Sequence, residues 1–387
     1  MALLSRVVLL GALLSPFVSA LPANSTTSPY VHPANGDCVD YTIVTKLTTE
    51  NLKWILPKVE NNFDVAKIAM GMARSDSAEK FNPTSGPTNE TKEYTISATY
   101  CSPKKEQKGR ESTVMVMTHG GGYDSRYWNP SYQPEKYSFS WYALEQGYSI
   151  FVYDRLGVGR SQIVSGYEVQ ASMQIELLAS MIKNLRAGKT SNTKPVSRII
   201  GVGHSLGSFV TNAAIAKYPD LVEGTPPTVV GAWLLTIFGS RIAKTVDPSF
   251  PQDSGYLAFS DIIPHTTTFF YSDPLDPSSP PLNIPTIEYA QGITQPIGLL
   301  ESFSFRNLSL AAGEFKGPVF ILSGAEDLLN CDGDCEKVYA EGGQDQVWAG
   351  TKPETYVLPN AGHGTVFAET AQEMFGEMVG FVQRHFE

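Results

Sequence analysis

One serine in this sequence lies where nucleophilic chemistry is expected. Ser205 is the centre of Gly203-His204-Ser205-Leu206-Gly207, which follows the apolar run 197–202 and precedes a helix-like segment, 208–217. A strand, a Gly-x-Ser-x-Gly turn and a helix in this order form a nucleophile elbow. The sharp turn strains the serine backbone, and the glycines remove Cβ atoms that would clash where strand and helix pass. The alternative is a glycine-rich connection with an incidental serine.

Two further motifs precede the elbow. His119-Gly120-Gly121-Gly122-Tyr123 directly follows the strand-like run 112–118, and Tyr153-Asp154-Arg155-Leu156-Gly157-Val158-Gly159-Arg160-Ser161 begins at the end of another, 149–153. Together with the elbow, these motifs resemble those of the α/β-hydrolase superfamily. From Tyr94 to Glu387 the chain is similar to secreted fungal α/β-hydrolases of the serine esterase and lipase type. The motifs are specific for the superfamily and say little about the substrate.

The resemblance implies a catalytic triad in the chain order Ser, acid, His. Three histidines follow Ser205: His265, His363 and His385. His363 lies in a glycine-flanked loop after the strand-like run 354–358, where a catalytic base is expected. His265 falls inside an insertion, and His385 lies near the end of the last helix. His363 is therefore the predicted base.

The acid is expected after the strand-like run 317–324, which ends in glycine and is followed by Ala325-Glu326-Asp327. In the family that the chain resembles, the acid lies three residues beyond such a glycine, which selects Asp327. Glu326 is the neighbouring alternative.

A tetrahedral intermediate also needs N–H donors for its oxyanion. The His-Gly-Gly-Gly sequence resembles the loop of lipases and esterases that supplies one donor, while the residue after the nucleophile supplies the other. Here the donors would be Gly121, with Gly122 as the alternative, and Leu206. His119 and His204 are expected to brace these loops through hydrogen bonds.

Strands and helices alternate after Tyr94, which predicts an α/β fold with a mostly parallel sheet covered by helices on both faces. Lys92–Tyr100 reads as an antiparallel edge strand, 228–238 as a strand, and 137–146, 168–187 and 365–387 as helices. The predicted hydrolase core is 94–238 and 317–387, and residues 21–93 form an N-terminal extension with a helix at 62–73. Prolines and aromatic residues cluster in 239–316, which is interpreted as a cap over the site.

The N-terminus reads as a secretory signal. Residues 1–20 combine Arg6, an apolar core at 7–14 and small residues that predict cleavage near Ala20. A membrane anchor is the alternative, but the apolar stretch is short for a bilayer. In a secreted chain, three triplets fit the N-glycosylation pattern and begin at Asn24, Asn89 and Asn307.

The sequence has four cysteines, and an even number in an oxidising compartment predicts two disulfides. Of the three possible pairings, Cys38 with Cys101 and Cys331 with Cys335 is favoured. The first bond would tie the N-terminal segment to the sheet, worth on the order of 3–5 kcal/mol by the loop-entropy estimate. The second would stiffen the loop after Asp327. A metal site in Cys-Asp-Gly-Asp-Cys is disfavoured because no histidine lies nearby.

The chain has 387 residues, 42% of them hydrophobic, enough for one large domain with an insertion. Its net charge of −10 argues against nucleic acid and anionic membranes as partners. The sequence thus predicts a secreted serine hydrolase of small or lipid-like carboxylic esters, without cofactor or metal and without stable membrane insertion. Lactone or thioester hydrolysis in fungal secondary metabolism is the alternative, and a catalytically silent binding protein is a further one.

Overall fold

The computed structural model describes residues 30–192, 196–225, 238–305, 308–342, 345 and 347–387. Its main sheet has the strand order β1-β2-β4-β3-β5. The strands are β1 (Gly36–Trp54), β2 (Thr84–Pro103), β3 (Thr113–Thr118), β4 (Ser149–Tyr153) and β5 (Arg198–Gly203). β3 runs parallel to both β4 and β5, whereas β1 and β2 are antiparallel to their neighbours.

A second parallel pair continues this sheet. It consists of β9 (Phe320–Gly324) and β10 (Glu354–Leu358). Parallel bridges from Ile200 to Gly224 and from Thr225 to Val319 connect β5 to β9. The strand predicted at 228–238 lies, except for its last residue, outside the described residues.

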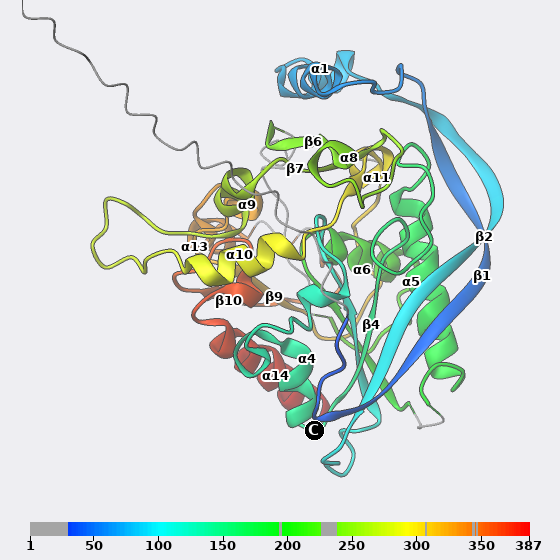
Figure 1. Ribbon diagram of the computed structural model, residues 1–387. Coiled ribbons are helices and arrows are strands. Elements are labelled where there is room, and N and C mark those ends of the chain that lie inside the picture. The colour runs from blue at the N-terminus through cyan, green and yellow to red at the C-terminus, as the bar shows by residue number, and fades with distance from the viewer. Residues whose placement is uncertain (1–29, 193–195, 226–237, 306–307, 343–344, 346) are drawn as a thin grey trace, which may run out of the picture.

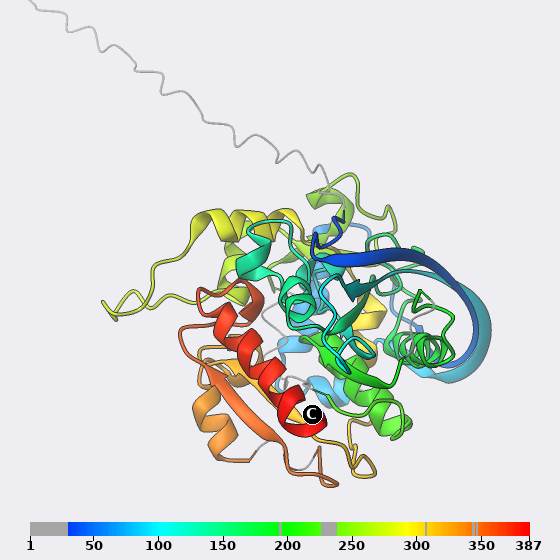
Figure 2. The ribbon, with the colours of Figure 1, turned by 90° about the horizontal axis from the view of Figure 1, so that it is seen from below.

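Helices cover both faces of the sheet, as the alternation of elements predicts. Side chains of a strand point alternately to opposite faces, so Val114 and Val116 of β3 join one core cluster while Met115 and Met117 join the other. The first cluster includes α5 (Ala171–Arg186) and α6 (Leu206–Lys217), and the second includes α4 (Phe139–Glu145) and α14 (Ala371–Phe386). Figures 1 and 2 show the two helix layers on opposite sides.

The edge of the sheet differs from the prediction. The strand predicted at Lys92–Tyr100 is the inner part of β2, which pairs with β4 on one side and with β1 on the other. β1 is therefore the edge strand, and residues before 94 belong to the main sheet. Its threonine-rich sequence gives only a weak alternation of apolar residues, so it is not recognised as a strand by pattern.

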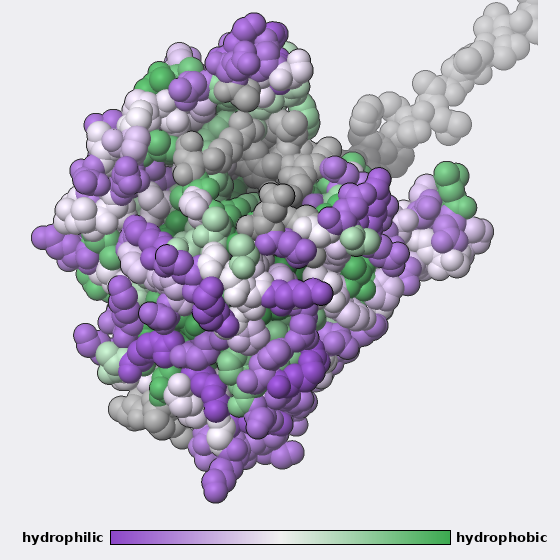
Figure 3. All heavy atoms as spheres, turned by 180° about the vertical axis from the view of Figure 1, so that it is seen from behind, coloured by the Kyte–Doolittle hydropathy of each residue, from purple (hydrophilic) through white to green (hydrophobic). Residues whose placement is uncertain are grey.

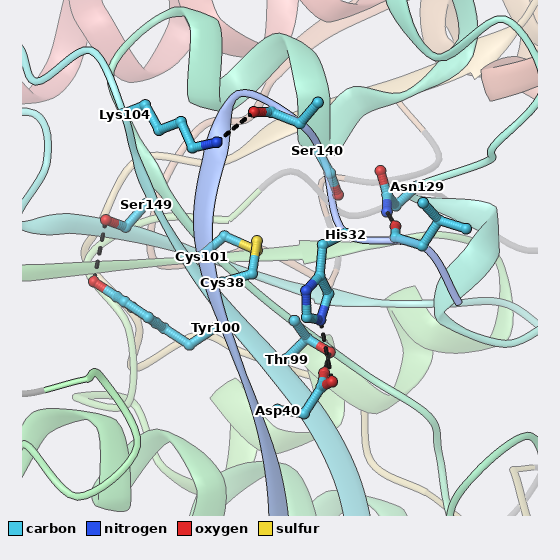
Figure 4. The surroundings of a disulfide bond; sticks show 12 residues. His32, Cys38, Asp40, Thr99, Tyr100, Cys101, Lys104, Asn129, Ser140 and Ser149 are labelled. Carbon is cyan, nitrogen blue, oxygen red and sulfur yellow. Dashed lines mark hydrogen bonds and ion pairs between the residues drawn. A yellow bond between two sulfur atoms is a disulfide. The ribbon is translucent and has the colours of Figure 1, made fainter. Parts of the chain in front are cut away.

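A disulfide joins the two strands of this hairpin. Cys38 and Cys101 lie directly opposite each other in β1 and β2 and form the bond that the sequence favours. Figure 4 shows it beside Asp40, whose carboxylate accepts hydrogen bonds from His32 at 3.1 Å and from Thr99 at 2.6 Å. The covalent bond and these side-chain contacts fix the start of β1 on the sheet.

The distal part of the β1–β2 hairpin extends away from the sheet and carries two helices, α1 (Asn62–Ala73) and α2 (Ser77–Lys80). α1 has the bounds that the sequence predicts. Its capping box explains the start, because Asn61 accepts from the N–H groups of Phe63 and Asp64 while the Asp64 side chain accepts from the Asn61 N–H. Its buried face packs with Ile242, Leu257, Leu299 and Phe303 of the following region.

We use the name cap for the described part of residues 239–316, some of whose side chains join the core cluster of the main sheet. It contains an antiparallel sheet of β6 (Ser240–Ile242), β7 (Tyr256–Phe259) and β8 (Ile297–Gly298). The helices are α8 (Ala243–Val246), α9 (Ile262–Phe269), α10 (Ile284–Gly292) and α11 (Leu299–Ser304). Figure 1 shows the cap above one end of the main sheet and below α1.

The remaining elements are short. They are α3 (Pro134–Tyr137), α12 (Leu328–Cys331), α13 (Cys335–Ala340) and the 3₁₀ turns η1 (Ser125–Tyr127) and η3 (Thr365–Phe367). The helix predicted from residue 365 begins only at Ala371, because residues 365–367 form the separate turn η3, which ends at the extended Ala368. None of the helices in the described ranges combines the length and apolarity needed to cross a membrane.

Candidate active site

Ser205 occupies a strained turn between β5 and α6. Its backbone has φ 52° and ψ −123°, a region that non-glycine residues rarely adopt. Such a conformation costs on the order of 1–3 kcal/mol and persists only where the surroundings enforce it. The residue is half-buried at the N-terminus of α6. The local geometry is that of a nucleophile elbow.

The two glycines of the turn are required by close packing. A Cβ atom on Gly203 would lie 2.6 Å from the Cα of Ser208. A Cβ atom on Gly207 would lie 2.3 Å from the carbonyl oxygen of Thr118 in β3. Both distances are far below a van der Waals contact, so α6 could not approach the sheet with any side chain at either position.

Asp327 and His363 meet at the ends of the two last strands. Asp327 follows β9, and His363 lies in the loop after β10. The Nδ1 atom of His363 donates to the Oδ2 atom of Asp327 at 2.9 Å. Both side chains are almost completely buried. Parallel neighbouring strands end at the same edge of the sheet, which explains how residues 36 positions apart come into contact.

The remaining lone pairs of Asp327 are also occupied. Its Oδ1 atom accepts from the N–H groups of Leu329 and Asn330 at 2.9 and 3.0 Å, so Asp327 is the N-cap of α12. The side-chain amide of Asn330 donates to Oδ2 at 2.7 Å. Asn330 was not identified from the sequence, and its place three residues after the acid is the only signal for it. Four donors hold this carboxylate in one orientation.

The alternative acid, Glu326, has a different partner. Its Oε2 atom accepts from the N–H of Ala361 at 3.0 Å, and its own N–H donates to the Ala361 carbonyl at 3.1 Å. Burial raises the pKa of the Glu326 carboxyl. Glu326 therefore anchors the loop that carries His363 rather than the imidazole itself.

His204 connects the serine turn to the histidine loop. Its Nε2 atom donates to the backbone carbonyl of His363 at 2.9 Å, and the two rings lie 4.8 Å apart. Burial, followed by the nearby His363, lowers the pKa of His204 well below its usual value. His204 therefore stays neutral and acts as a brace, as the sequence analysis expects. Among the described residues, the buried Nε2 atom of His363 has no hydrogen-bond partner.

The glycine loop after β3 packs against the serine. A Cβ atom on Gly120 would lie 3.1 Å from the Cβ of Ser205, and one on Gly121 would lie 3.7 Å from the Leu206 side chain. The structure thus brings together Gly121 and Leu206, the two predicted oxyanion donors. Gly122 has φ 77°, a Cβ atom on it would face Phe259 of the cap, and its carbonyl accepts from the Gln295 N–H of the cap at 2.8 Å.

The cap contacts both the glycine loop after β3 and the loop that carries His363. The Gly364 N–H donates to the carbonyl oxygen of Phe269, at the end of α9, at 2.7 Å. The Phe269 ring lies 5.2 Å from that of His363. On the other side, Tyr123 Oη and His265 Nε2 share a hydrogen bond of 2.7 Å. His265 therefore links the cap to the glycine loop, and His363, not His265, is the histidine that contacts Asp327.

A buried ion pair was not identified from the sequence. Arg155, after β4, pairs with Glu301 of α11, and neither side chain is exposed. Arg155 belongs to the motif Asp154–Ser161, and its place in this motif gives no sign of a partner. Glu301 is a single carboxylate close to Leu299, Leu300 and Phe303, which is the one signal that could have marked it.

The second disulfide lies beside the acid. Cys331, at the end of α12, is bonded to Cys335, at the start of α13, which is the pairing favoured by the sequence. Asn89 is exposed on the hairpin, whereas Asn24, Asn307 and the predicted signal segment lie outside the described residues. Within the described ranges, no group of three or more His, Cys, Asp or Glu side chains is arranged for a metal ion.

Comparison with known proteins identifies the family. A model described as the alpha/beta hydrolase family matches residues 115–377, so the chain belongs to this family. One curated relative, a protein of Stutzerimonas stutzeri (strain A1501) that carries the name carbamate hydrolase RutD, is 27% identical over 151 residues. That match covers 38% of this chain and 49% of the relative, so the chain spans about half the length of the curated relative it matches.

Solved structures share the fold. A thermophilic esterase from Thermogutta terrifontis, with malate bound, has a TM-score of 0.52 at 17% identity and covers 76% of this chain and 95% of its own. A protein of Mycobacterium tuberculosis that carries the name non-heme bromoperoxidase BpoC has a TM-score of 0.50 at 16% identity, with 76% and 97% covered. At these identities the likeness shows the α/β-hydrolase fold alone.

Proposed function

We propose that this protein is a secreted serine hydrolase that cleaves carboxylic esters through Ser205, His363 and Asp327. The observation that carries the proposal is the hydrogen bond of Asp327 to the Nδ1 atom of His363, in a loop that His204 ties to the strained serine turn. With Nδ1 protonated, the lone pair of the imidazole is on Nε2, the atom that can accept a proton from serine.

The proposed reaction has two halves. In the first, His363 Nε2 removes the proton of the Ser205 hydroxyl, whose oxygen attacks the ester carbonyl carbon. The tetrahedral intermediate then collapses, the bond to the leaving alkoxide breaks, and the imidazolium returns the proton to it as alcohol. In the second half, water attacks the acyl-enzyme with the same histidine as base, which releases the acid and regenerates Ser205.

The backbone N–H groups of Gly121 and Leu206 are proposed to bind the oxyanion. The packing of Gly120 against Ser205 and of Gly121 against Leu206 supports this role. A donor of this kind is worth about 10²–10³-fold in kcat. The positive end of α6 adds to the stabilisation, since Leu206 is its first residue.

For the substrate we propose a small or lipid-like ester. The support is the aromatic character of the cap side of the site, where Phe259, His265 and Phe269 form a contiguous set of rings. The face seen in Figure 3 is mostly hydrophilic, with apolar residues scattered among the polar ones. The same chemistry can cleave thioesters, lactones and carbamates. A panel of candidate substrates for the purified protein should therefore contain these three classes beside carboxylic esters.

Export is part of the proposal. Two disulfides among the described residues are compatible with an oxidising compartment. If the signal is cleaved near Ala20, the secreted protein should begin near Leu21, and its Asn89 should carry a glycan. N-terminal sequencing and glycosidase treatment of secreted protein test both points. A chain that keeps residues 1–20 would refute the predicted cleavage.

The central experiment is Ser205→Ala. We expect loss of labelling by a fluorophosphonate probe and a fall in ester turnover of at least about 10³-fold, because triad members act as a unit. Ser172→Ala is the control, since the Ser172 hydroxyl bonds Asn51 of the hairpin and should leave labelling unchanged. Labelling of Ser205→Ala at the wild-type rate would refute the assignment of the nucleophile. A folded wild-type protein that neither reacts with the probe nor hydrolyses any substrate of the panel would favour a catalytically silent binding protein.

A further inference from the structure

The peptide unit that joins Gly120 to Gly121 is held from its carbonyl side. The oxygen of Gly120 accepts hydrogen bonds from Nδ1 of His119 at 2.9 Å and from Nη2 of Arg155 at 3.3 Å. No cis peptide bond occurs among the described residues. In a trans peptide the C=O and the next N–H point in opposite directions. The two donors on the oxygen therefore also fix the direction of the Gly121 N–H.

The hydrogen bonds define the protonation state of His119. Its Nε2 atom accepts from the backbone N–H of Arg155 at 3.0 Å, and a backbone N–H can only donate. The proton of the neutral ring must therefore be on Nδ1, which faces the Gly120 oxygen. Burial and the charge of Arg155 lower the pKa of His119 to about 3. The ring is thus a neutral donor to Gly120 at any working pH.

Arg155 brings a full positive charge to the same oxygen. Its side chain is completely buried, and its counter-ion is Glu301 of α11, in the cap. Gln174 of α5 completes the arrangement, because its Nε2 atom donates to Glu301 at 2.7 Å and to the Leu156 carbonyl at 2.9 Å. A buried charge is tolerated only when it is paired, so the cap supplies the group that keeps the guanidinium beside Gly120.

We propose that Arg155, held in place by Glu301 of the cap, is a positioning residue that orients and polarises the Gly121 N–H toward the oxyanion. This inference rests on the proposed serine hydrolase function. A cation at a carbonyl oxygen draws electron density through the amide, which makes the N–H at the other end a stronger donor. The cap thereby contributes to transition-state stabilisation without touching the reacting atoms.

The test separates positioning from folding. In Arg155→Met, the Glu301 carboxylate is left buried and unpaired, so a large fall in melting temperature is expected. In the double variant Arg155→Met with Glu301→Leu, both charges are replaced by apolar groups, which typically restores stability. We expect the double variant to regain most of the melting temperature while kcat stays about 10–100-fold below wild type and KM changes by less than about threefold.

Inhibition provides a second readout. A trifluoromethyl ketone forms a hemiketal oxyanion with the active serine, so its affinity should fall in proportion to kcat in the double variant. The matched control is Arg126→Met with Asp124→Asn, which removes another buried ion pair that also reaches the cap at Ile293. The control should change melting temperature without a comparable loss of kcat. Recovery of kcat together with melting temperature in the Arg155–Glu301 double variant would overturn the proposal.

A third readout does not depend on turnover. The chain has Gly–Gly bonds only at 120–121, 121–122 and 342–343. In protein labelled with glycine that carries a ¹³C carbonyl and a ¹⁵N amide, an NMR experiment that selects ¹³C–¹⁵N peptide bonds therefore detects the amides of these bonds alone. The Gly121 amide signal should shift in the double variant and stay in place in the control. An unchanged Gly121 signal overturns the positioning role, whereas a shift in a protein without Ser205-dependent turnover refutes only the proposed function.

Discussion

Replacement of Asp327 by asparagine should reverse the hydrogen bond to His363. The Oδ1 atom of Asp327 accepts two backbone N–H groups at the start of α12, and the only acceptor of an asparagine must stay there to cap the helix. The amide NH₂ then takes the place of Oδ2, facing Nδ1 of His363. A donor at that place requires Nδ1 to be unprotonated, which moves the ring proton to Nε2.

The expected effect on catalysis is large and that on stability is small. With its proton on Nε2, the imidazole cannot accept the proton of Ser205, and the same change in a Ser-His-Asp enzyme lowers kcat about 10⁴-fold. We expect a similar loss here. Asparagine is as good an N-cap as aspartate, so α12 should still form. The new NH₂ group would also face the NH₂ group of Asn330, so that two donors would oppose each other. A flip of the Asn330 amide replaces its NH₂ by its oxygen and removes this conflict.

Glu326→Gln is the matched comparison. The glutamine oxygen can still accept from the Ala361 N–H, so kcat should remain within about threefold of wild type. The assay is kcat on an activated ester for both variants, with thermal unfolding as the check on folding. If Asp327→Asn keeps more than a tenth of the wild-type kcat while Glu326→Gln loses activity, the acid is Glu326 and the reasoning from the Nδ1 contact is refuted.

Three further perturbations test other parts of the structure. The double variant Cys331→Ser with Cys335→Ser opens the disulfide ring of three intervening residues beside Asp327. Its kcat should fall by up to about 10²-fold, with only a small shift in melting temperature. A kcat equal to that of the wild type would contradict this expectation. Burial lowers the pKa of His265 from 6.5 to about 3. Between pH 6.5 and pH 3 the histidine is therefore protonated in the unfolded chain but not in the folded one, so the free energy of unfolding decreases as the pH falls through this range. In denaturant unfolding, this loss of about 1.4 kcal/mol per pH unit should be absent from His265→Gln. Parallel plots of unfolding free energy against pH for the variant and the wild type would contradict the expectation. Gly207→Ala would place a Cβ atom 2.3 Å from a carbonyl oxygen of β3 and should prevent or severely weaken folding. Gly376→Ala in α14 has room for the Cβ atom and should raise stability by up to about 1 kcal/mol. Similar melting temperatures for the two variants would disprove the packing argument.

The sequence alone locates the candidate triad because each member lies at the end of an apolar strand. Such strands are recognisable locally, and parallel strands end at one edge of the sheet, so Ser205, Asp327 and His363 could be assigned to one edge before any contact was known. α1 was predictable for a similar reason, since its cap at Asn61 and its apolar periodicity both lie within one short segment.

Long-range pairing was not predictable in this way. β1 finds its place through a register with β2 that spans a helical excursion, and nothing in its own residues indicates which strand lies beside it. The Arg155–Glu301 pair joins residues 146 positions apart. A single sequence contains the charges but not the burial that makes them significant, so a buried arginine and a surface arginine look the same.

The cap is tied to the two loops beside Ser205 by backbone hydrogen bonds and an ion pair. It holds the glycine loop through Gln295, whose N–H donates to the Gly122 carbonyl, and it holds the histidine loop through the Phe269 carbonyl, which accepts from the Gly364 N–H. It also supplies Glu301, the counter-ion of a fully buried arginine of the core. Removal of the cap would leave backbone donors and acceptors unpaired and a charge without its partner, each of which costs free energy. The glycine loop and the loop of His363 therefore depend on the cap for their positions, so, under the proposed function, substitutions at these contacts should change kcat as well as substrate preference.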